Sequence, residues 1–262
     1  MYCAIRNYND YNFNGDKTHI KEYIYNYNSD MVSLLKETKD KENIVIKMPN
    51  NPTKAQLEYA KMFRNARTNA RFMVADELID ELPCFFQPGI FNADSLDKLK
   101  ELCEMGVTDV YVSGSLGFDL KSARIIADKY NVKIRVIPNM AQVATFSLFE
   151  GKRKDISSFW IRPEDIHMYE DLVDVVEFIG NDKKQPTFYE IYFQSKTWKG
   201  NLAVIIAGLE DVNNIAIPKE FTERRLDCGK KCLIDRCHSC FKYKSLADLA
   251  KEHNLEVEVE SE

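Results

Sequence analysis

The sequence predicts an α/β protein with a TIM-type (β/α)8 barrel, complete or incomplete, and a C-terminal four-cysteine metal-binding loop. Three observations predict this fold class. The chain has 262 residues, of which 45% are hydrophobic, enough for a barrel with a full core. Short β-branched or aromatic runs alternate with longer helical segments, as in βα units around a parallel sheet. Finally, four of the seven cysteines lie close together near the C-terminus.

Eight segments have the composition of strands, which is the number that a (β/α)8 barrel needs. They are residues 2–6, 43–48, 71–75, 84–87, 109–113, 133–137, 158–162 and 174–178. Residues 7–30 are polar and aromatic without a clean period, so they form either a long loop or a disturbed first helix. An open doubly wound sheet would give nearly the same order of segments. However, no strand precedes a complete glycine-rich phosphate loop, and the nearest match, SGSLG at 113–117, lacks a third glycine and a lysine.

Three helices are predicted over residues 54–64, 95–105 and 119–130, where apolar positions recur at spacings of three and four. For the second of them we expect Asp94 as the N-cap, because an aspartate side chain can accept a hydrogen bond from the first turn. Gly106 follows its last turn, where a left-handed residue commonly ends a helix.

We expect two parts in the chain: an α/β barrel over residues 1–200, and an extension over 201–262 that packs on the barrel and carries the metal site. The formal net charge is -5, which indicates no overall attraction to nucleic acid or to an anionic membrane. The N-terminus has no basic stretch followed by an apolar run, and no stretch of about 18 apolar residues occurs. The sequence therefore predicts a cytoplasmic protein in a reducing compartment with no membrane segment.

The clustered cysteines have the spacing C-x3-C-x4-C-x2-C, and Gly229 after the first of them permits a sharp bend. In a reducing compartment, clustered thiols are typical of metal sites rather than disulfides. Four thiolates suit either a 4Fe-4S cluster or zinc, and the spacing alone does not distinguish them. The predicted ligands are Cys228, Cys232, Cys237 and Cys240. The remaining three cysteines are scattered in or beside apolar segments, and we expect them to act as small hydrophobic side chains; they are Cys3, Cys84 and Cys103.

Basic residues surround the predicted ligands. Residues 224–244 hold seven lysines and arginines against Asp227 and Asp235, a local charge of +5 in a chain of net charge -5. These cations can compensate the negative charge of a thiolate centre. Alternatively, they form a phosphate-contacting patch in which Phe241 and Tyr243 stack on bases.

In βα barrels, reactive groups lie at the carboxyl ends of strands and in the loops that follow. The polar residues at these positions are Lys47, Asp76, Gln87, Asn139, Gln142, Arg162 and Glu177. Our catalytic candidates among them are Arg162, Glu177, Asn139 and Asp76. Arg162 stands out because Pro163 fixes the following turn, and an arginine held in this way can bind a carboxylate or phosphate with two hydrogen bonds. No Ser/His/Asp triad is indicated, since none of the four histidines follows a strand in a way that would pair it with a nucleophile.

Three stretches together resemble the collagenase-like peptidase family: GVTDVYVSGSLGFDLKSARIIADKYNVKIRVIPNMAQ, SFWIRPEDIHMYEDLVDVVEF and ERRLDCGKKC. The resemblance covers roughly residues 106–240. It implies an α/β barrel and an iron-sulfur cluster, since some members are iron-sulfur proteins linked to oxygen-independent hydroxylation of tRNA or of ubiquinone precursors. Members usually have cluster cysteines after a central strand, whereas this chain has no cysteine from 104 to 227.

Two functions follow as hypotheses. The first is an iron-sulfur enzyme, such as a hydroxylase, that modifies RNA or a small anionic aromatic substrate. The second is a non-catalytic protein in which zinc holds a basic C-terminal loop that docks nucleic acid or a protein partner.

Overall fold

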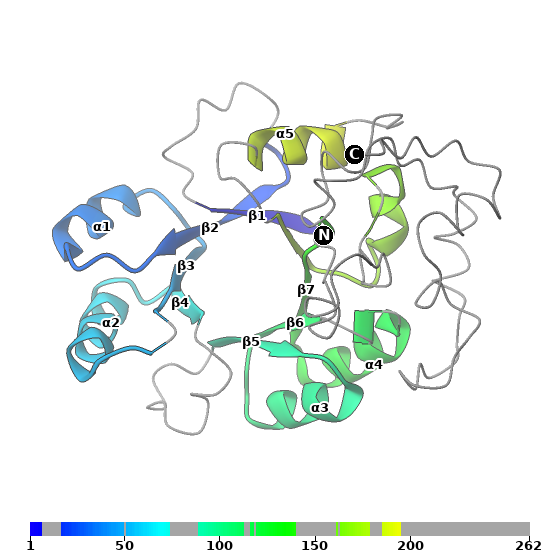
Figure 1. The fold of residues 1–262 in the computed structure, drawn as a ribbon, viewed down its shortest axis with the longest axis horizontal. Helices are drawn as coiled ribbons and strands as arrows, with labels where there is room; N and C mark the ends of the chain where they lie inside the picture. The colour runs from blue at the N-terminus through cyan, green and yellow to red at the C-terminus, as the bar shows by residue number, and fades with distance from the viewer. Residues whose placement is uncertain are drawn as a thin grey trace, which may run out of the picture.

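A computed structural model describes a closed barrel of eight parallel strands that follow one another around the barrel in chain order (Figure 1). The described residues are 1–6, 17–49, 51–73, 89–112, 116–117, 119–139, 161, 163–178 and 185–194. The strands are β1 Tyr2–Arg6, β2 Ile20–Asn26, β3 Ile44–Lys47, β4 Ala70–Met73, β5 Gly89–Ala93, β6 Asp109–Val112, β7 Lys133–Val136 and β8 Val175–Glu177. The predicted α/β barrel class is therefore confirmed.

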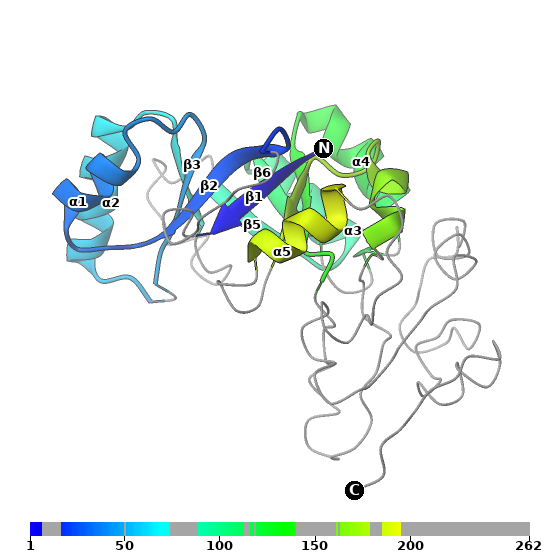
Figure 2. The same ribbon diagram turned by 90° about the horizontal axis from the view of Figure 1, so that it is seen from above.

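Helices cover the outside of the barrel, as the βα pattern predicts. They are α1 Met31–Glu37, α2 Lys54–Ala66, α3 Leu96–Glu104, α4 Leu120–Tyr130 and α5 Gln185–Tyr189, with a 3-10 helix η5 at Pro163–Tyr169 and a π-helix η7 at Glu190–Gln194. Figure 2 shows α1 and α2 together on one side and α3 and α4 on the other. Within the described residues, no helix is both long and apolar enough to cross a membrane.

Local signals in the sequence set the ends of several helices. Thr53 and Gln56 form a reciprocal capping box at the start of α2. Ser95, and not Asp94 as predicted, caps α3, because the Ser95 side chain accepts a hydrogen bond from the Lys98 amide. Gly106 has the expected left-handed backbone, with φ of 83°.

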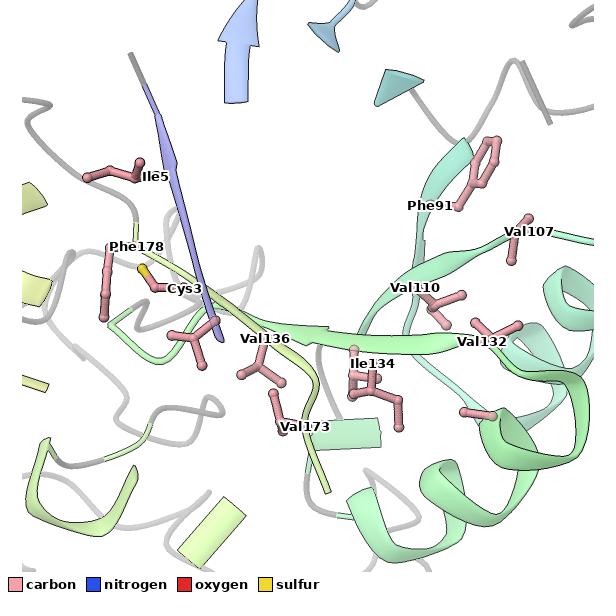
Figure 3. Close-up of a cluster of buried hydrophobic side chains, with 14 of the residues drawn as sticks. Cys3, Ile5, Phe91, Val107, Val110, Val132, Ile134, Val136, Val173 and Phe178 are labelled. Atoms are coloured by element: carbon pink, nitrogen blue, oxygen red, sulfur yellow. The ribbon is translucent and has the colours of Figure 1, made fainter. Parts of the chain in front are cut away.

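The main core lies between the outer face of the barrel and its helices (Figure 3). Outward strand residues such as Cys3, Val110 and Ile134 are fully buried, and α4 packs Ala123 and Ala127 against the sheet. Cys3 and Cys103 are buried and form no disulfide with each other, as predicted for cysteines that act as small hydrophobic side chains. Burial of this apolar surface is the main source of stability for such a fold.

Two of the observed strands, β2 and β5, were not predicted. Residues 7–30 contain a strand, β2, rather than only a loop or a helix. The fifth strand is Gly89–Ala93, whereas the predicted segment 84–87 lies outside the described residues. Finally, β7 pairs directly with β8, so the barrel closes without the predicted strand at 158–162, of which Ile161 alone lies among the described residues. The proposed boundary near residue 200 stays a prediction, because residues 195–262 lie outside the described part of the chain.

Candidate functional site at the barrel mouth

The barrel interior is filled by alternate residues of each strand. A small apolar cluster lies there, consisting of Ala4, Ile24, Val45, Ile90 and Val175, with Tyr2, Met73 and Tyr111 packed against it. These positions alternate with outward residues that belong to the main core. The interior is therefore packed, and its unusual feature is the charged groups that it also contains.

Four charged side chains from four strands form one ionic network inside the barrel. Arg135 of β7 places Nη1 3.2 Å from Oε2 of Glu22 on β2 and 3.1 Å from Oδ1 of Asp109 on β6. Arg71 of β4 also pairs with both carboxylates. Glu22, Asp109 and Arg135 are fully buried, and the side chain of Arg71 is 12% exposed. Each carboxylate therefore meets two guanidinium groups, an arrangement that compensates for the loss of hydration.

The electrostatics of the network favour its ionised form. Burial alone would lower the pKa of Arg135, but the carboxylates of Glu22 and Asp109 raise it well above its ordinary value. Burial acts against the ionised form of Asp109 as well, yet the charges of Arg135 and Arg71 lower the pKa of that carboxyl. The network is thus a set of opposite charges that stabilise one another.

Tyr2 and Lys133 close the amino-terminal side of this network. The Tyr2 hydroxyl donates to Glu22 at 3.5 Å, and the Lys133 ammonium donates to the Tyr2 oxygen at 3.4 Å. Burial, and then the Glu22 carboxylate, raise the pKa of Tyr2 to about 12, so its hydroxyl keeps its proton. Since the amino-terminal face of such barrels usually serves stability, we assign this end a structural role.

Asp109 gives a prediction for acid stability. Its pKa in the folded protein is lowered from 3.8, so it contributes stability above pH 3.8 that is lost as the pH falls through the lower, folded pKa. We expect the free energy of unfolding, measured with urea between about pH 5 and pH 2.5, to fall less steeply in Asp109→Asn than in the unaltered protein. Equal slopes in the two proteins would contradict this assignment.

At the opposite end, polar side chains gather where the strands finish. Asn26 pairs with Lys47 across β2 and β3, and Asn92 pairs with Tyr111 across β5 and β6. Asn26 and Asn92 are exposed, and Lys47 is half-buried. We call this set, with the neighbouring Met73, the barrel mouth. No carboxylate among the described residues pairs with the Lys47 ammonium, which leaves a cation available to a ligand.

Below the mouth, a side-chain hydrogen bond joins β6 to β8 past the strand between them, β7. The Tyr111 hydroxyl donates to Oε2 of Glu177 on β8. Tyr111 is half-buried, whereas Glu177 is fully buried. The Arg135 guanidinium lies 5.2 Å from the centre of the Tyr111 ring, and its Nη2 lies 4.0 Å from Oε2 of Glu177. Glu177 thus connects the mouth to the ionic network.

The structure describes part of the predicted site. Glu177 lies inside the barrel near the mouth, in agreement with its predicted strand-end position. Asn139 is fully buried just beyond β7, close to where the Tyr192 hydroxyl donates to the Ile161 carbonyl at 2.8 Å and to the Pro138 carbonyl at 3.4 Å. The predicted residues that lie outside the described part of the chain are Asp76, Gln87, Gln142, Arg162, Cys228, Cys232, Cys237 and Cys240.

No metal site occurs in the part of the chain that is described. There, no three His, Cys, Asp or Glu side chains are grouped so that they could hold a metal ion. The interior carboxylates instead pair with arginines. The metal prediction therefore depends wholly on the four C-terminal cysteines.

Several residues of the site were not singled out from the sequence: Asn26, Asn92, Tyr111 and the network formed by Glu22, Arg71, Asp109 and Arg135. One signal was present, because DVYV holds Asp109 and KIRV holds Lys133 and Arg135 in otherwise apolar strands, where alternate residues share a face. A charge on the interior face of a buried strand needs a partner, and this requirement could have indicated the network.

No protein-family model and no curated protein matches this chain. The resemblance to collagenase-like peptidases accordingly stays a prediction, and the functional argument depends on the site itself.

Proposed function

We propose that the chain is a metal-containing barrel enzyme that modifies a small anionic aromatic substrate at the barrel mouth. The observation that carries this proposal is the position of the Lys47 cation beside Asn26 and Met73, at the carboxyl ends of the parallel strands. In barrels of this architecture that end holds the active site.

The residues of the mouth suit the two parts of such a ligand. Lys47 pairs with its anionic group, and the amides of Asn26 and Asn92 supply hydrogen bonds. The Met73 thioether and the Tyr111 ring offer apolar contact to an aromatic ring. RNA is the other substrate that the resemblance implies. We favour the small ligand because the contacting groups lie on inward-facing positions of the strands rather than on a broad outer surface.

The proposal includes a 4Fe-4S cluster held by Cys228, Cys232, Cys237 and Cys240, since four cysteine thiolates are a donor set that fits it. A bound cluster would supply electron transfer. Hydroxylation is the reaction we propose, following the family resemblance. A cytoplasmic location belongs to the proposal as well, because a reducing compartment keeps these thiols available.

A second candidate is a non-catalytic binding protein in which the same cysteines hold zinc. The local charge of +5 over residues 224–244 favours it, because a basic loop can dock nucleic acid or an acidic protein surface. This candidate needs no ligand at the barrel mouth, and that difference separates the two.

Benzoate serves as a probe of the mouth, with binding measured by titration calorimetry. We expect Lys47→Ala to weaken benzoate binding at least about tenfold, since a charged hydrogen bond contributes about 1.5–3 kcal/mol. Lys100→Ala is the matched control, because Lys100 forms an exposed ion pair with Glu104 at 3.8 Å on α3. Equal binding to both variants would contradict the proposed site. Binding of a short single-stranded RNA without any binding of benzoate would favour the second candidate.

A further inference from the structure

Three residues of the barrel mouth form one continuous row across neighbouring strands. Asn26 of β2 pairs in register with Lys47 of β3, and Lys47 pairs in turn with Met73 of β4. Asn26 and Lys47 each come two residues after a member of the interior apolar cluster, so both lie on the inner face of their strands. Met73 packs against the same cluster. We call these three residues the rim row.

Backbone hydrogen bonds fix the rim row in place across β2, β3 and β4. The Tyr27 amide donates to the Lys47 carbonyl at 2.9 Å, and the Met48 amide donates to the Met73 carbonyl at 2.9 Å. Strand pairing therefore continues past the row, and neighbouring strands of a sheet lie about 4.8 Å apart. A single ligand group placed between β2 and β3 is thus within reach of both the Asn26 and the Lys47 side chains.

The row changes from polar to apolar as it passes from β2 towards β5. Asn26 is exposed, Lys47 and Met73 are half-buried, and Ile90, which pairs with Met73 on β5, is buried. Within the described part of the chain, neither the Asn26 amide nor the Lys47 ammonium is bound by another side chain. A ligand can therefore keep its charged end hydrated at β2 while its apolar part lies over Met73.

A carboxylate fits the polar end of the row. It has two acceptor oxygens and one negative charge, so the Lys47 ammonium can donate to one oxygen and the Asn26 amide to the other. A phenolate offers a single oxygen, on which two donors from different strands would have to converge. A phosphate monoester carries about 1.5 to 2 negative charges at neutral pH. Of the residues that make up the barrel mouth, Lys47 alone is charged, and its single charge matches a carboxylate.

We propose that the substrate bound at the barrel mouth is an aromatic carboxylate, and that Asn26 makes the site specific for this group. Lys47 and Asn26 hold the two carboxylate oxygens between β2 and β3, and the aromatic ring lies over Met73 on β4. Lys47 supplies the charge that attracts an anion, whereas Asn26 selects among anions. This inference rests on the proposed function, because it requires a ligand at the mouth.

Two anionic probes test the role of Asn26: benzoate, which has two acceptor oxygens, and 4-nitrophenolate, whose ionised group has one. Titration calorimetry gives the affinity of each probe at a pH at which both are ionised. In Asn26→Leu we expect benzoate to bind about tenfold more weakly, since a hydrogen bond to a charged group is lost, and 4-nitrophenolate to bind almost as before. Lys47→Ala should weaken the binding of both probes.

Asn26→Asp is a second variant of similar size. The new carboxylate would lie beside Lys47 and compete with the probe for its charge, so we expect benzoate to bind more weakly than it does to Asn26→Leu. Asn65→Asp is the matched control, because Asn65 is exposed in the last turn of α2 on the outside of the barrel, and it should leave the affinity unchanged. Urea unfolding checks that each variant is folded.

The outcomes separate this inference from the proposed function. If Asn26→Leu weakens benzoate binding no more than 4-nitrophenolate binding, Asn26 does not select the carboxylate and the inference is overturned. The ligand site itself then stands, provided that Lys47→Ala weakens binding. If neither probe binds to the unaltered protein, the ligand site and the inference fail together.

Discussion

Arg135→Met is expected to lower the free energy of unfolding by about 3–5 kcal/mol, because it removes one partner from a buried ionic network. Arg135 has no exposed surface, and its guanidinium bonds to both Glu22 and Asp109. Without it, Arg71 is the ion-pair partner that the described residues still offer to the two buried carboxylates. Urea unfolding followed by circular dichroism measures the change.

The matched control is Lys98→Met, which breaks an exposed ion pair with Glu101 at 2.9 Å on α3. This change should stay within about 0.5 kcal/mol, since surface pairs contribute little. If Arg135→Met does not fold at all, Arg71→Met offers a smaller perturbation, because the Arg71 side chain is 12% exposed. An unchanged free energy of unfolding in both arginine variants would contradict the role of the network.

The second large effect concerns the C-terminal cysteines. Replacement of Cys228, Cys232, Cys237 or Cys240 by serine should each remove most of the bound metal. Loss of a direct thiolate ligand costs more than the roughly 10–100-fold in affinity that loss of an outer hydrogen-bond partner costs. Metal per chain after desalting is the measurement.

Cys3 and Cys103 provide the controls, because both are buried in the apolar core. Their replacement by alanine should lower stability by leaving small cavities and should not change the metal content. Full metal content in every C-terminal variant would show that these cysteines are not the ligands.

The sequence predicted strands best where an apolar pattern was uninterrupted. Tyr2–Arg6 was predicted with the observed bounds, and Lys133–Val136 within one residue. The strand at Ile20–Asn26 was missed because its interior positions hold Glu22 and Asn26, which resemble those of a polar loop. The partner that makes Glu22 acceptable there is Arg135, 113 residues further along the chain. A local sequence pattern cannot reveal an ion pair between two residues so far apart in the chain.

A barrel strand was also predicted at residues 158–162, where the apolar run is SFWIR; of these residues, Ile161 alone lies in the described part of the chain. Ile161 is indeed buried, but its carbonyl accepts a hydrogen bond from the Tyr192 hydroxyl, while β7 and β8 pair directly. A buried apolar position such as Ile161 therefore need not belong to a barrel strand. The sequence of a single segment does not indicate which strands are neighbours in the sheet.

The candidate site shows the same limit. Glu177 was predicted because an acidic residue near a strand end is conspicuous. Tyr111 was not, because an aromatic residue in DVYV is typical of a strand core. Its importance comes from the hydrogen bond to Glu177, 66 residues away, which only the closed barrel brings about.

Metal analysis of the anaerobically purified protein tests the proposed function most directly. Iron, acid-labile sulfide and zinc are measured per chain, together with the visible absorption spectrum. We expect a brown protein with about four iron and about four sulfide atoms per chain, as four thiolates and one 4Fe-4S cluster require. A colourless protein with about one zinc would contradict the iron-sulfur enzyme and favour the binding protein. A protein that binds neither metal would contradict both.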